Sequence, residues 1–434
     1  MKSVLTRRQF LQRATVAGLA APFLTSGLAS HGASPNEKLD IGVIGVANQG
    51  NYDLTNVAHE NIVALCDIDD NYLKAASEKF PNAKTYNDFR RLLDQKGIDA
   101  VVVAIPDHCH AVATMGALRS GRHVYCEKPL AHTISETRLV TETARKENRV
   151  TQLGTQIHAG NNYRRVVELV QRGAVGPVKE VHVWVNSSYG GMELPKETPP
   201  VPANIHYDLW LGPVEPRPYS PQWVPFKWRN WWAFGGGSLA DFGCHYMDLP
   251  FWALDLKYPL SAEVVDGPPV HPESTPPWLI VRYEFPARGE QPPVRLTWYH
   301  GGKEPALLSK IVSPDYIGRW KSAVLFVGAK GMLLADYNRH QLLPEKDFVG
   351  FTPPTPFIRN SIGHHKEWTE ACKNGGKTTC NFAYSGPLTE TALLGNVAYR
   401  SGTKLQWDPI QLRAPKCAEA ERYLQHKYRA GWSI

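Results

Sequence analysis

Between residues 38 and 154 the chain alternates short apolar runs with amphipathic segments of helical length. Strands are expected at residues 39–46, 62–67, 100–105, 122–126 and 150–153, and helices at 50–59, 70–80, 111–120 and 134–147. The run at 100–105 contains only Ala, Val and Ile, as expected for a central parallel strand that is buried on both faces. This alternation predicts a doubly wound parallel sheet of the Rossmann type over residues 38–155.

The turn after the first predicted strand carries small residues at the spacing of a dinucleotide-binding loop. Gly45, Ala47 and Gly50 match G-x-G-x-x-G with alanine in the middle position. The first allows a tight turn, the second lets the backbone approach a pyrophosphate, and the third allows close packing of helix on strand. Because the helix N-terminus faces the phosphates, Asn48 and Gln49 are expected cofactor contacts as well.

Acidic and imidazole side chains follow two further strands of this domain. Asp67 ends the second strand, where a carboxylate accepts hydrogen bonds from ribose hydroxyls and repels a 2′-phosphate. No arginine follows it at once, so NAD is favoured over NADP. Pro106 and His110 follow the run at 100–105 and are expected near the cofactor, although His110 would equally serve to cap the next helix.

A Glu127-Lys128-Pro129 triplet follows the strand at 122–126. Most such triplets are solvated turns. At the end of a strand in a nucleotide-binding sheet, however, Lys128 can place its ammonium group beside a nicotinamide ring, and Glu127 would lie near the same cofactor. The proline fixes its own φ angle and removes a backbone donor, which holds the turn.

After residue 154 the pattern becomes mixed. Helices are expected at residues 163–171, 239–254, 362–373 and 388–401, and strands at 177–186, 278–285, 294–298, 323–327 and 332–335. Residues 156–407 are therefore predicted to form an α+β domain with an open, mostly antiparallel sheet. Residues 408–434 are predicted to be an arm that wraps its own chain or a neighbour.

The first 33 residues have the pattern of an export signal. Arg7 and Arg8 precede a short apolar stretch and a small-residue end. The pair with Phe10 and Leu11 behind it predicts a twin-arginine signal, which implies a folded, exported, periplasmic protein. An ordinary secretory leader is the alternative. Without these residues the chain has 44 basic and 41 acidic side chains, a balance that does not indicate nucleic-acid binding.

The seven cysteines are scattered, with no CxxC pair and no zinc-finger spacing. We therefore predict no metal site and no disulfide framework, although Cys372 and Cys380 could pair in an oxidising compartment. No run beyond the leader is long and apolar enough to span a membrane.

Taken together, these features make the chain resemble the Gfo/Idh/MocA oxidoreductase family. The resemblance rests on the 45–50 turn, Asp67, the 105–110 segment, Glu127-Lys128-Pro129, the run 154–156 and the run 237–248. It implies a Rossmann domain, a C-terminal α/β domain, a sugar or cyclitol substrate between them, and homo-oligomers built through the open sheet.

The same resemblance implies a catalytic set of Lys128, Asp241 and His245. Asp241 and His245 are four residues apart, so on a helix they share one face. His245 can take a hydroxyl proton while Asp241 orients the imidazole or contacts a neighbouring hydroxyl. Lys128 beside a cationic nicotinamide should have a lowered pKa. A capping Asp and a packed His are the alternative.

Further side chains are expected to contact substrate. His158 and Tyr163 follow the position where many relatives carry Arg, and an aromatic, basic segment precedes the predicted catalytic helix. From that segment we predict contacts from Trp228, Arg229, Trp231 and Trp232, since indole faces stack on sugar rings. Core packing is equally expected for any single Trp among them.

These features predict an exported NAD(P)-dependent oxidoreductase that moves hydride between a sugar or polyol carbon and a tightly bound nicotinamide cofactor. The same residues would also serve a glycosidase that oxidises C3 transiently, eliminates the C1 substituent, adds water and re-reduces the sugar. A sugar-binding protein without catalysis is a third alternative, which intact Lys128, Asp241 and His245 disfavour.

Overall fold

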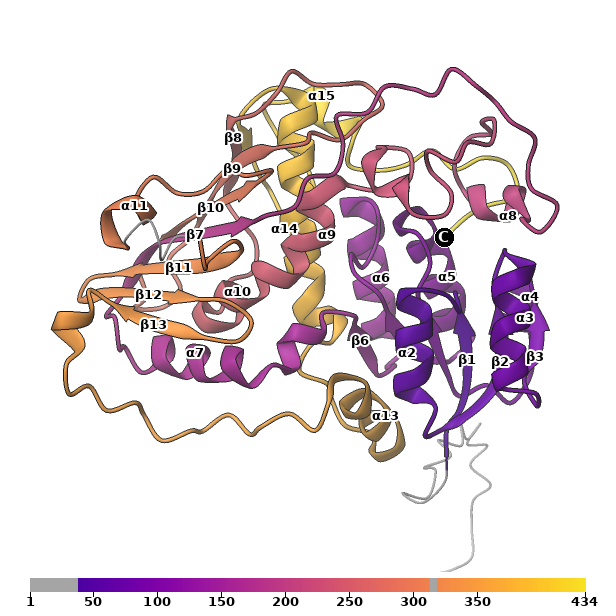
Figure 1. The fold of residues 1–434 in the computed structure, drawn as a ribbon, viewed down its shortest axis with the longest axis horizontal. Helices are drawn as coiled ribbons and strands as arrows, with labels where there is room; N and C mark the ends of the chain where they lie inside the picture. The colour runs from indigo at the N-terminus through magenta and orange to yellow at the C-terminus, as the bar shows by residue number, and fades with distance from the viewer. Residues whose placement is uncertain (1–37, 313–317) are drawn as a thin grey trace, which may run out of the picture. The chain divides into compact units, whose positions relative to one another are not determined.

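The computed structural model describes residues 38–312 and 318–434, and the predicted export signal lies outside them. Within this part, the first sheet has six parallel strands in the order β3-β2-β1-β4-β5-β6, which confirms the predicted Rossmann architecture (Figure 1). Its strands are β1 (Asp40–Ile44), β2 (Asn61–Cys66), β3 (Lys84–Tyr86), β4 (Ala100–Val103), β5 (His123–Cys126) and β6 (Thr151–Leu153). Its helices are α2 (Gln49–Val57), α3 (Asp70–Lys79), α4 (Phe89–Asp94), α5 (Asp107–Arg119) and α6 (Ile134–Lys146).

The order of this sheet reverses between β1 and β4, and ligands of such sheets bind outside the carboxyl ends of the strands at that point. All four residues of β4 are fully buried, as its composition predicts. Strand β3 and helix α4 were not predicted. Since β3 is three polar or half-buried residues, it carries no apolar run that could indicate a strand.

The second sheet has eight strands among the described residues, in the order β13-β12-β11-β7-β10-β9-β8-β14. Only β7 and β10 pair in parallel, so the sheet is mostly antiparallel, as predicted. Its strands are β7 (Val178–Val185), β8 (Ser261–Asp266), β9 (Leu279–Phe285), β10 (Val294–His300), β11 (Ala323–Gly328), β12 (Gly331–Ala335), β13 (His340–Leu343) and β14 (Leu405–Gln406).

Two of the four helices predicted after residue 154 differ from the prediction, and three short helices were not predicted. The helices and 3₁₀ turns that surround this sheet are η1 (Gln156–Ala159), α7 (Asn161–Gln171), α8 (Tyr207–Leu211), η2 (Lys227–Asn230), α9 (Gly237–Tyr246), α10 (Asp248–Leu254), α11 (Leu308–Ile311), η3 (Glu345–Phe348), α13 (His364–Asn374), α14 (Phe382–Ser401) and α15 (Ala418–Glu421). The helix predicted over 239–254 is divided into α9 and α10 at Met247, because the ring of Pro250 would clash with the carbonyl of residue 246 in a continuous helix. Helix α14 begins at Phe382, six residues before the predicted start, and continues through Pro387.

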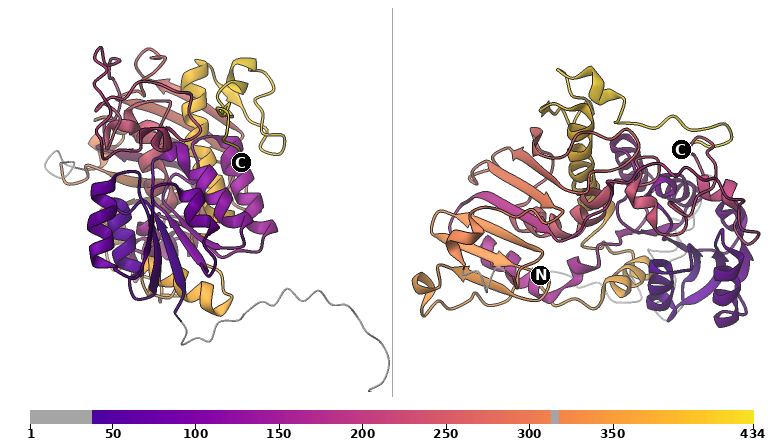
Figure 2. Two further views of the ribbon diagram at one scale, coloured as in Figure 1. Left: turned by 90° about the vertical axis from the view of Figure 1, so that its right-hand side faces the viewer. Right: turned by 45° about the horizontal axis from the view of Figure 1, so that its top comes forward.

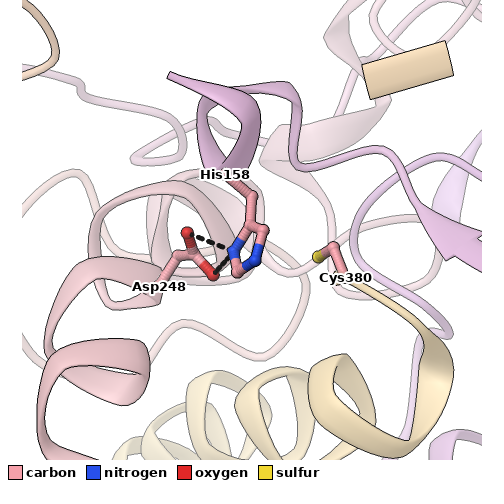
Figure 3. Close-up of side chains that lie close together, drawn as sticks. All are labelled: His158, Asp248 and Cys380. Atoms are coloured by element: carbon pink, nitrogen blue, oxygen red, sulfur yellow. Dashed lines mark hydrogen bonds and ion pairs between the residues drawn. The ribbon is translucent and has the colours of Figure 1, made fainter. Parts of the chain in front are cut away.

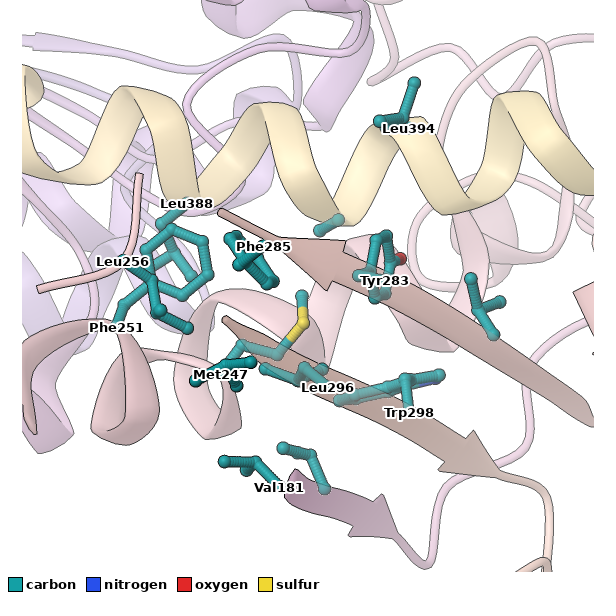
Figure 4. Packing of buried hydrophobic residues seen from close by; sticks show 14 of the residues in the cluster. Val181, Met247, Phe251, Leu256, Tyr283, Phe285, Leu296, Trp298, Leu388 and Leu394 are labelled. Carbon is teal, nitrogen blue, oxygen red and sulfur yellow. The ribbon is translucent and has the colours of Figure 1, made fainter. Parts of the chain in front are cut away.

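Helix α14 packs against α6 of the first domain and against α9 and β8 of the second (Figure 1). Arg138 of α6 and Glu390 of α14 form a bidentate ion pair, with both distances 2.8 Å. Beneath α14, Tyr283, Phe285 and Leu296 point from β9 and β10 into the largest apolar core, shown in Figure 4. The two domains thus share one central helix.

The C-terminal arm wraps its own chain (Figure 2). Arg429 forms an ion pair of 2.6 Å with Asp208 of α8, and Tyr428 donates a short hydrogen bond to Glu136 of α6. Along the described residues no helix combines the length and apolarity needed to cross a bilayer. All seven cysteines, which lie in this part of the chain, are unpaired.

Candidate active site

A cavity of about 310 Å³ lies at the carboxyl ends of β1, β2, β4 and β5. It collects most of the predicted cofactor residues. Those that line it are Gly45, Ala47, Asn48, Gln49, Asp67, Pro106, Glu127 and Lys128. The cavity therefore lies where the turn at 45–50 predicts a nucleotide site.

The glycines of this turn are required by close backbone contacts. Gly45 has a φ of +87°, and a Cβ on it would lie 2.1 Å from the carbonyl oxygen of Ala104. A Cβ on Gly50 would lie 2.1 Å from the carbonyl oxygen of Gly45. Gly50 does not reach the cavity. It allows α2 to start directly against the turn, which is the packing role expected of the third glycine.

Asp67 lies at the cavity edge and is held by backbone amides. Its Oδ2 accepts a hydrogen bond of 3.0 Å from Val46 N, and its Oδ1 accepts one of 3.0 Å from Asp69 N. Burial raises the pKa of the Asp67 carboxyl, and the two amides offset part of that effect. Asp69, not Asp67, caps α3, so Asp67 remains available to a ribose.

His110 lies behind the cavity wall instead of in it. The ring is 1% exposed, with Nδ1 2.6 Å from the carbonyl oxygen of Pro129 and Nε2 2.6 Å from that of Ile105. It thereby ties the end of β4 to the Lys128 turn. The structure shows this positioning role, and the predicted cofactor contact stays a prediction.

Of the three predicted catalytic residues, Lys128 lines the cavity, whereas Asp241 and His245 do not. Lys128 Nζ forms a short ion pair with Asp241 Oδ1, and Arg229 Nε donates to the same oxygen at 3.1 Å. Burial opposes ionisation of Asp241, but the two cations outweigh it and hold the carboxyl pKa well below its usual range. Asp241 is therefore an anion shared between Lys128 and Arg229.

The pKa of the Lys128 ammonium group is set by its burial and by Asp241. Burial lowers the pKa of its ammonium group, but the carboxylate of Asp241 more than compensates, so the pKa is raised overall. The lowered pKa predicted for Lys128 concerns the site with an oxidised nicotinamide bound, and it stays a prediction. In this structure Lys128 is a protonated, hydrogen-bond-donating group.

His245 lies one helical turn beyond Asp241 on α9, as the spacing predicts. Burial and the Lys128 ammonium lower the pKa of its imidazole to about 3, so the ring is neutral at physiological pH. Its Nδ1 is buried and has no hydrogen-bond partner among the described residues. A neutral imidazole nitrogen without a partner can accept a hydrogen bond from a substrate hydroxyl, whereas burial and the Lys128 charge keep the ring a weak base in this state.

Several wall residues were not predicted. Asp107, the first residue of α5, is 2% exposed, and burial raises the pKa of its carboxyl to about 7, offset in part by Arg229. Phe89 and Trp432 line the other end of the cavity with ring centroids 5.9 Å apart, and Arg90 lies 4.5 Å over the Trp432 ring. Trp432 arrives from the C-terminal arm, so only the folded chain could reveal it.

The four aromatic and basic residues predicted from the 228–232 segment lie in different parts of the structure. Trp228 and Arg229 line the cavity, with the Arg229 guanidinium 4.0 Å over the indole of Trp228. Trp231 is fully buried and donates its Nε1–H to Gln222 O at 2.8 Å. Trp232 packs in the second domain's core and donates to His271 O at 3.1 Å. The structure thus places two of the four at the cavity and two in packed cores.

His158 and Tyr163 also lie in packed surroundings. Figure 3 shows His158 between Asp248 and Cys380, with Nδ1 2.9 and 3.0 Å from the two Asp248 oxygens. These three side chains are the described group that comes nearest to a metal-ligand set. The Asp248 carboxylate, however, already accepts from His158 and, at 2.7 Å, from the hydroxyl of Tyr384. Neither His158 nor Tyr163 lines the cavity, so their contacts with substrate stay predictions.

The glycines before α9 serve packing. A Cβ on Gly236 would lie 2.5 Å from Ala240 Cβ, and one on Gly237, whose φ is +63°, would lie 2.8 Å from Thr275. The neighbours of both glycines are side chains of the protein, and this packing fixes the start of the helix that carries Asp241 and His245.

Comparisons with known proteins agree with this site. Residues 39–155 match the model for the NAD-binding Rossmann fold of the Gfo/Idh/MocA oxidoreductase family, and residues 165–290 match its C-terminal alpha/beta domain. Inositol 2-dehydrogenase of Salmonella typhimurium is 30% identical over 150 residues, which are 33% of this chain and 45% of that protein. D-glucoside 3-dehydrogenase of Escherichia coli is 32% identical over 193 residues, 44% of this chain and 46% of that protein. The matches thus span less than half of these curated relatives.

Two solved structures share the fold at low sequence identity. The WlbA dehydrogenase from Bordetella pertussis, in complex with NADH and UDP-GlcNAcA, has a TM-score of 0.60 at 16% identity, over 86% of this chain and 99% of that one. Aldose-aldose oxidoreductase from Caulobacter crescentus has a TM-score of 0.56 at 17% identity, over 85% of this chain and 100% of that one. With both family models matched in order on one chain, the protein belongs to the Gfo/Idh/MocA oxidoreductase family.

Proposed function

We propose that the protein is an exported NAD-dependent oxidoreductase that transfers hydride between a sugar or polyol carbon and a tightly held nicotinamide cofactor. The observation that carries the proposal is the Lys128–Asp241–Arg229 cluster, with neutral His245 beside it, at one end of the nucleotide cavity. Such a cluster can bind a hydroxyl and move its proton.

The described residues fit a dinucleotide. Gly45 gives the turn that a pyrophosphate requires, and Asp67 presents a carboxylate to a ribose at the cavity edge. That carboxylate favours NAD over NADP, because it would repel a 2′-phosphate. When bound, NAD supplies the hydride acceptor.

The chain's own residues supply the proton chemistry. The neutral imidazole of His245 accepts the hydroxyl proton during oxidation and returns it during reduction. The ammonium group of Lys128 donates a hydrogen bond to the substrate oxygen and stabilises negative charge that develops there. Asp241 fixes the Lys128 ammonium, while Arg229 and the Trp228 indole form the wall on which a sugar ring would lie.

The substrate class is supported by the names of the relatives, an inositol dehydrogenase and a glucoside dehydrogenase. Export through the twin-arginine machinery is supported by Arg7 and Arg8 in their sequence context. Because no pool regenerates free NAD outside the cytoplasm, we propose that the cofactor stays bound and is recycled between two sugars. We further propose a homo-oligomer built through the open sheet.

The test is mass spectrometry of nucleotides released from the denatured, natively exported protein, together with a sugar and polyol oxidation screen. We expect stoichiometric NAD and reduction of that NAD by at least one sugar or polyol. Lys128→Met should retain the nucleotide but lower turnover by about 10²-fold or more. Protein that carries no nucleotide and gains no thermal stability from added NAD would refute the proposal.

A glycosidase is the second candidate. Similarity to a D-glucoside 3-dehydrogenase favours oxidation at C3, which is also the first step of the elimination route. Incubation with aryl glycosides separates the two functions. Release of the aglycone without net NADH would identify a hydrolase, and accumulation of a keto sugar with equivalent NADH would identify a dehydrogenase.

A further inference from the structure

Two carboxyl groups lie together beneath the cavity floor. Glu127 lines the cavity and is 5% exposed, and Asp53 of α2 lies behind it with no exposed surface. A single amide nitrogen, Gln49 Nε2, donates to both carboxyl groups, and Asp53 Oδ2 has no hydrogen-bond donor among the described residues. Two buried carboxyl groups that share one donor cannot both ionise cheaply, so such a pair holds a proton.

The pair is held by neutral hydrogen-bond donors. Glu127 Oε1 accepts from Gln49 Nε2 at 3.1 Å and from Gln156 Nε2 at 2.5 Å. Asp53 Oδ1 accepts from Gln49 Nε2 at 3.3 Å and lies 2.8 Å from His365 Nε2. Amide donors position the carboxyl groups without adding a charge that would fix them in the ionised form.

The titratable groups that face the pair come from three elements. Lys128 follows β5, Tyr125 lies in β5 and stacks on His365 of α13 at 4.7 Å, and Tyr52 of α2 lies edge-on to His365 at 5.5 Å. Burial lowers the pKa of His365 to about 4, so this imidazole is neutral and adds no positive charge. Both tyrosines have pKa values raised first by burial and then by the acid pair, so they stay protonated.

Burial, reinforced for Glu127 by the neighbouring Asp53, raises the pKa of each carboxyl group to about 8. Hydrogen bonds and the Lys128 ammonium offset only part of the effect. The pair therefore titrates in the neutral range, where a single new charge in the cavity would change its protonation.

We propose that Asp53 and Glu127 form a proton store that is coupled to the oxidation state of the bound nicotinamide. The inference rests on the proposed function. With an oxidised, positively charged ring in the cavity the pair holds one proton fewer than it does with a reduced, neutral ring.

The proton balance closes inside the site. Oxidation of a secondary alcohol forms a C=O bond, sends the hydride pair of electrons to the nicotinamide and releases one proton. His245 is the first acceptor of that proton, and the pair gains one proton as the positive charge in the cavity disappears, so none is released from the site. Reduction of the next sugar reverses each change. A protein that recycles one bound cofactor would thus return to solvent neither electrons nor protons between its two half-reactions.

The test measures the midpoint potential of NAD bound to the full-length holoenzyme, poised against mediator dyes from about pH 6 to about pH 9, a range that brackets the pair. A two-electron couple shifts by about 30 mV for a tenfold change in equilibrium constant. Uptake of one proton then gives about 30 mV per pH unit, and uptake of two gives about 60 mV. We expect the steeper slope below pH 8 and the shallower slope above it.

Variants of the acid pair show which side chains take up the second proton on reduction. Asp53→Asn should move the end of the steep segment to lower pH, and Asp53→Asn with Glu127→Gln should give about 30 mV per pH unit throughout. Asp94→Asn is the control, since Asp94 is exposed on α4 and lies 3.7 Å from Arg91. A wild-type slope of about 30 mV throughout, or a steep segment that survives in the double variant, overturns the proton store alone. Absence of bound NAD overturns the proposed function with it.

Discussion

Alanine at position 154 should displace the Glu127 carboxyl group from the cavity floor. A Cβ built on Gly154 lies 2.3 Å from Glu127 Oε1 and 2.4 Å from its Cδ. Carbon and oxygen in ordinary contact are about 3.3 Å apart, so Glu127 must move by about 1 Å. Its amide donors, Gln49 and Gln156, hold it where it is.

The cost can be worked from these contacts. Overpacking a tight site costs about 1–3 kcal/mol, and each hydrogen bond lost adds about 1 kcal/mol. We therefore expect Gly154→Ala to lower the free energy of unfolding by about 2–3 kcal/mol and to weaken NAD binding. Because Gly154 does not have a positive φ, the backbone accepts alanine and the effect is steric.

Urea unfolding and calorimetric titration with NAD are the assays. Gly376→Ala is the matched control, since a Cβ there lies 3.7 Å from its nearest neighbour, and it should change stability by less than about 0.5 kcal/mol. Glu127→Asp shortens the acid and should recover part of the lost stability in the Gly154→Ala background. A Gly154→Ala protein with the wild-type urea midpoint and the wild-type affinity for NAD would refute the reasoning.

Three further changes test the rest of the site. Asp241→Asn leaves two buried cations without their anion, so it should lower the free energy of unfolding by about 3 kcal/mol at neutral pH, measured by urea unfolding. Because the folded-state pKa of the Asp241 carboxyl is depressed, the stability difference from wild type should shrink as the pH falls below about 4. Asp107 has a raised folded-state pKa, so its ionisation destabilises the fold as the pH rises from about 4 to about 7. Asp107→Asn should therefore flatten the fall in stability over that range by on the order of 2 kcal/mol in unfolding experiments at several pH values. Trp228→Phe should raise KM for the sugar. Trp231→Phe should instead lower the free energy of unfolding by about 1–3 kcal/mol and leave KM unchanged. Equal KM values for the wild type and both variants would contradict the substrate contact assigned to Trp228.

The first domain could be predicted from sequence because its signals are local. Each strand is a short apolar run, and the 45–50 turn needs only its own residues and Ala104 to be recognised as a phosphate loop. The exceptions were β3 and α4, which are short and half-exposed. Asp67 and the Lys128 turn were found for the same reason, since each directly follows a strand.

The parts of the site that were missed depend on long-range contacts. Trp432 reaches the cavity only because the C-terminal arm crosses the first domain. Asp53 shares the Gln49 amide with Glu127 only because α2 packs on β1 and β4. Trp231 has extended backbone dihedrals directly after η2, and Trp232 lies in the turn that follows. Trp231 packs in the core around Trp228, whereas Trp232 packs in the core under α14.

The catalytic cluster combines residues from two domains, so its geometry depends on how those domains are joined. Lys128 is held by the Rossmann sheet, and Asp241 by α9 of the second domain. Helix α14 touches α9 on one side and α6 on the other, and the Arg138–Glu390 pair fixes it to α6. The Lys128–Asp241 ion pair therefore joins the two domains directly, and its geometry depends on the packing of α14. The proposed change at this site is one of protonation, because the Asp53–Glu127 pair can change its charge while the packed helices stay in place.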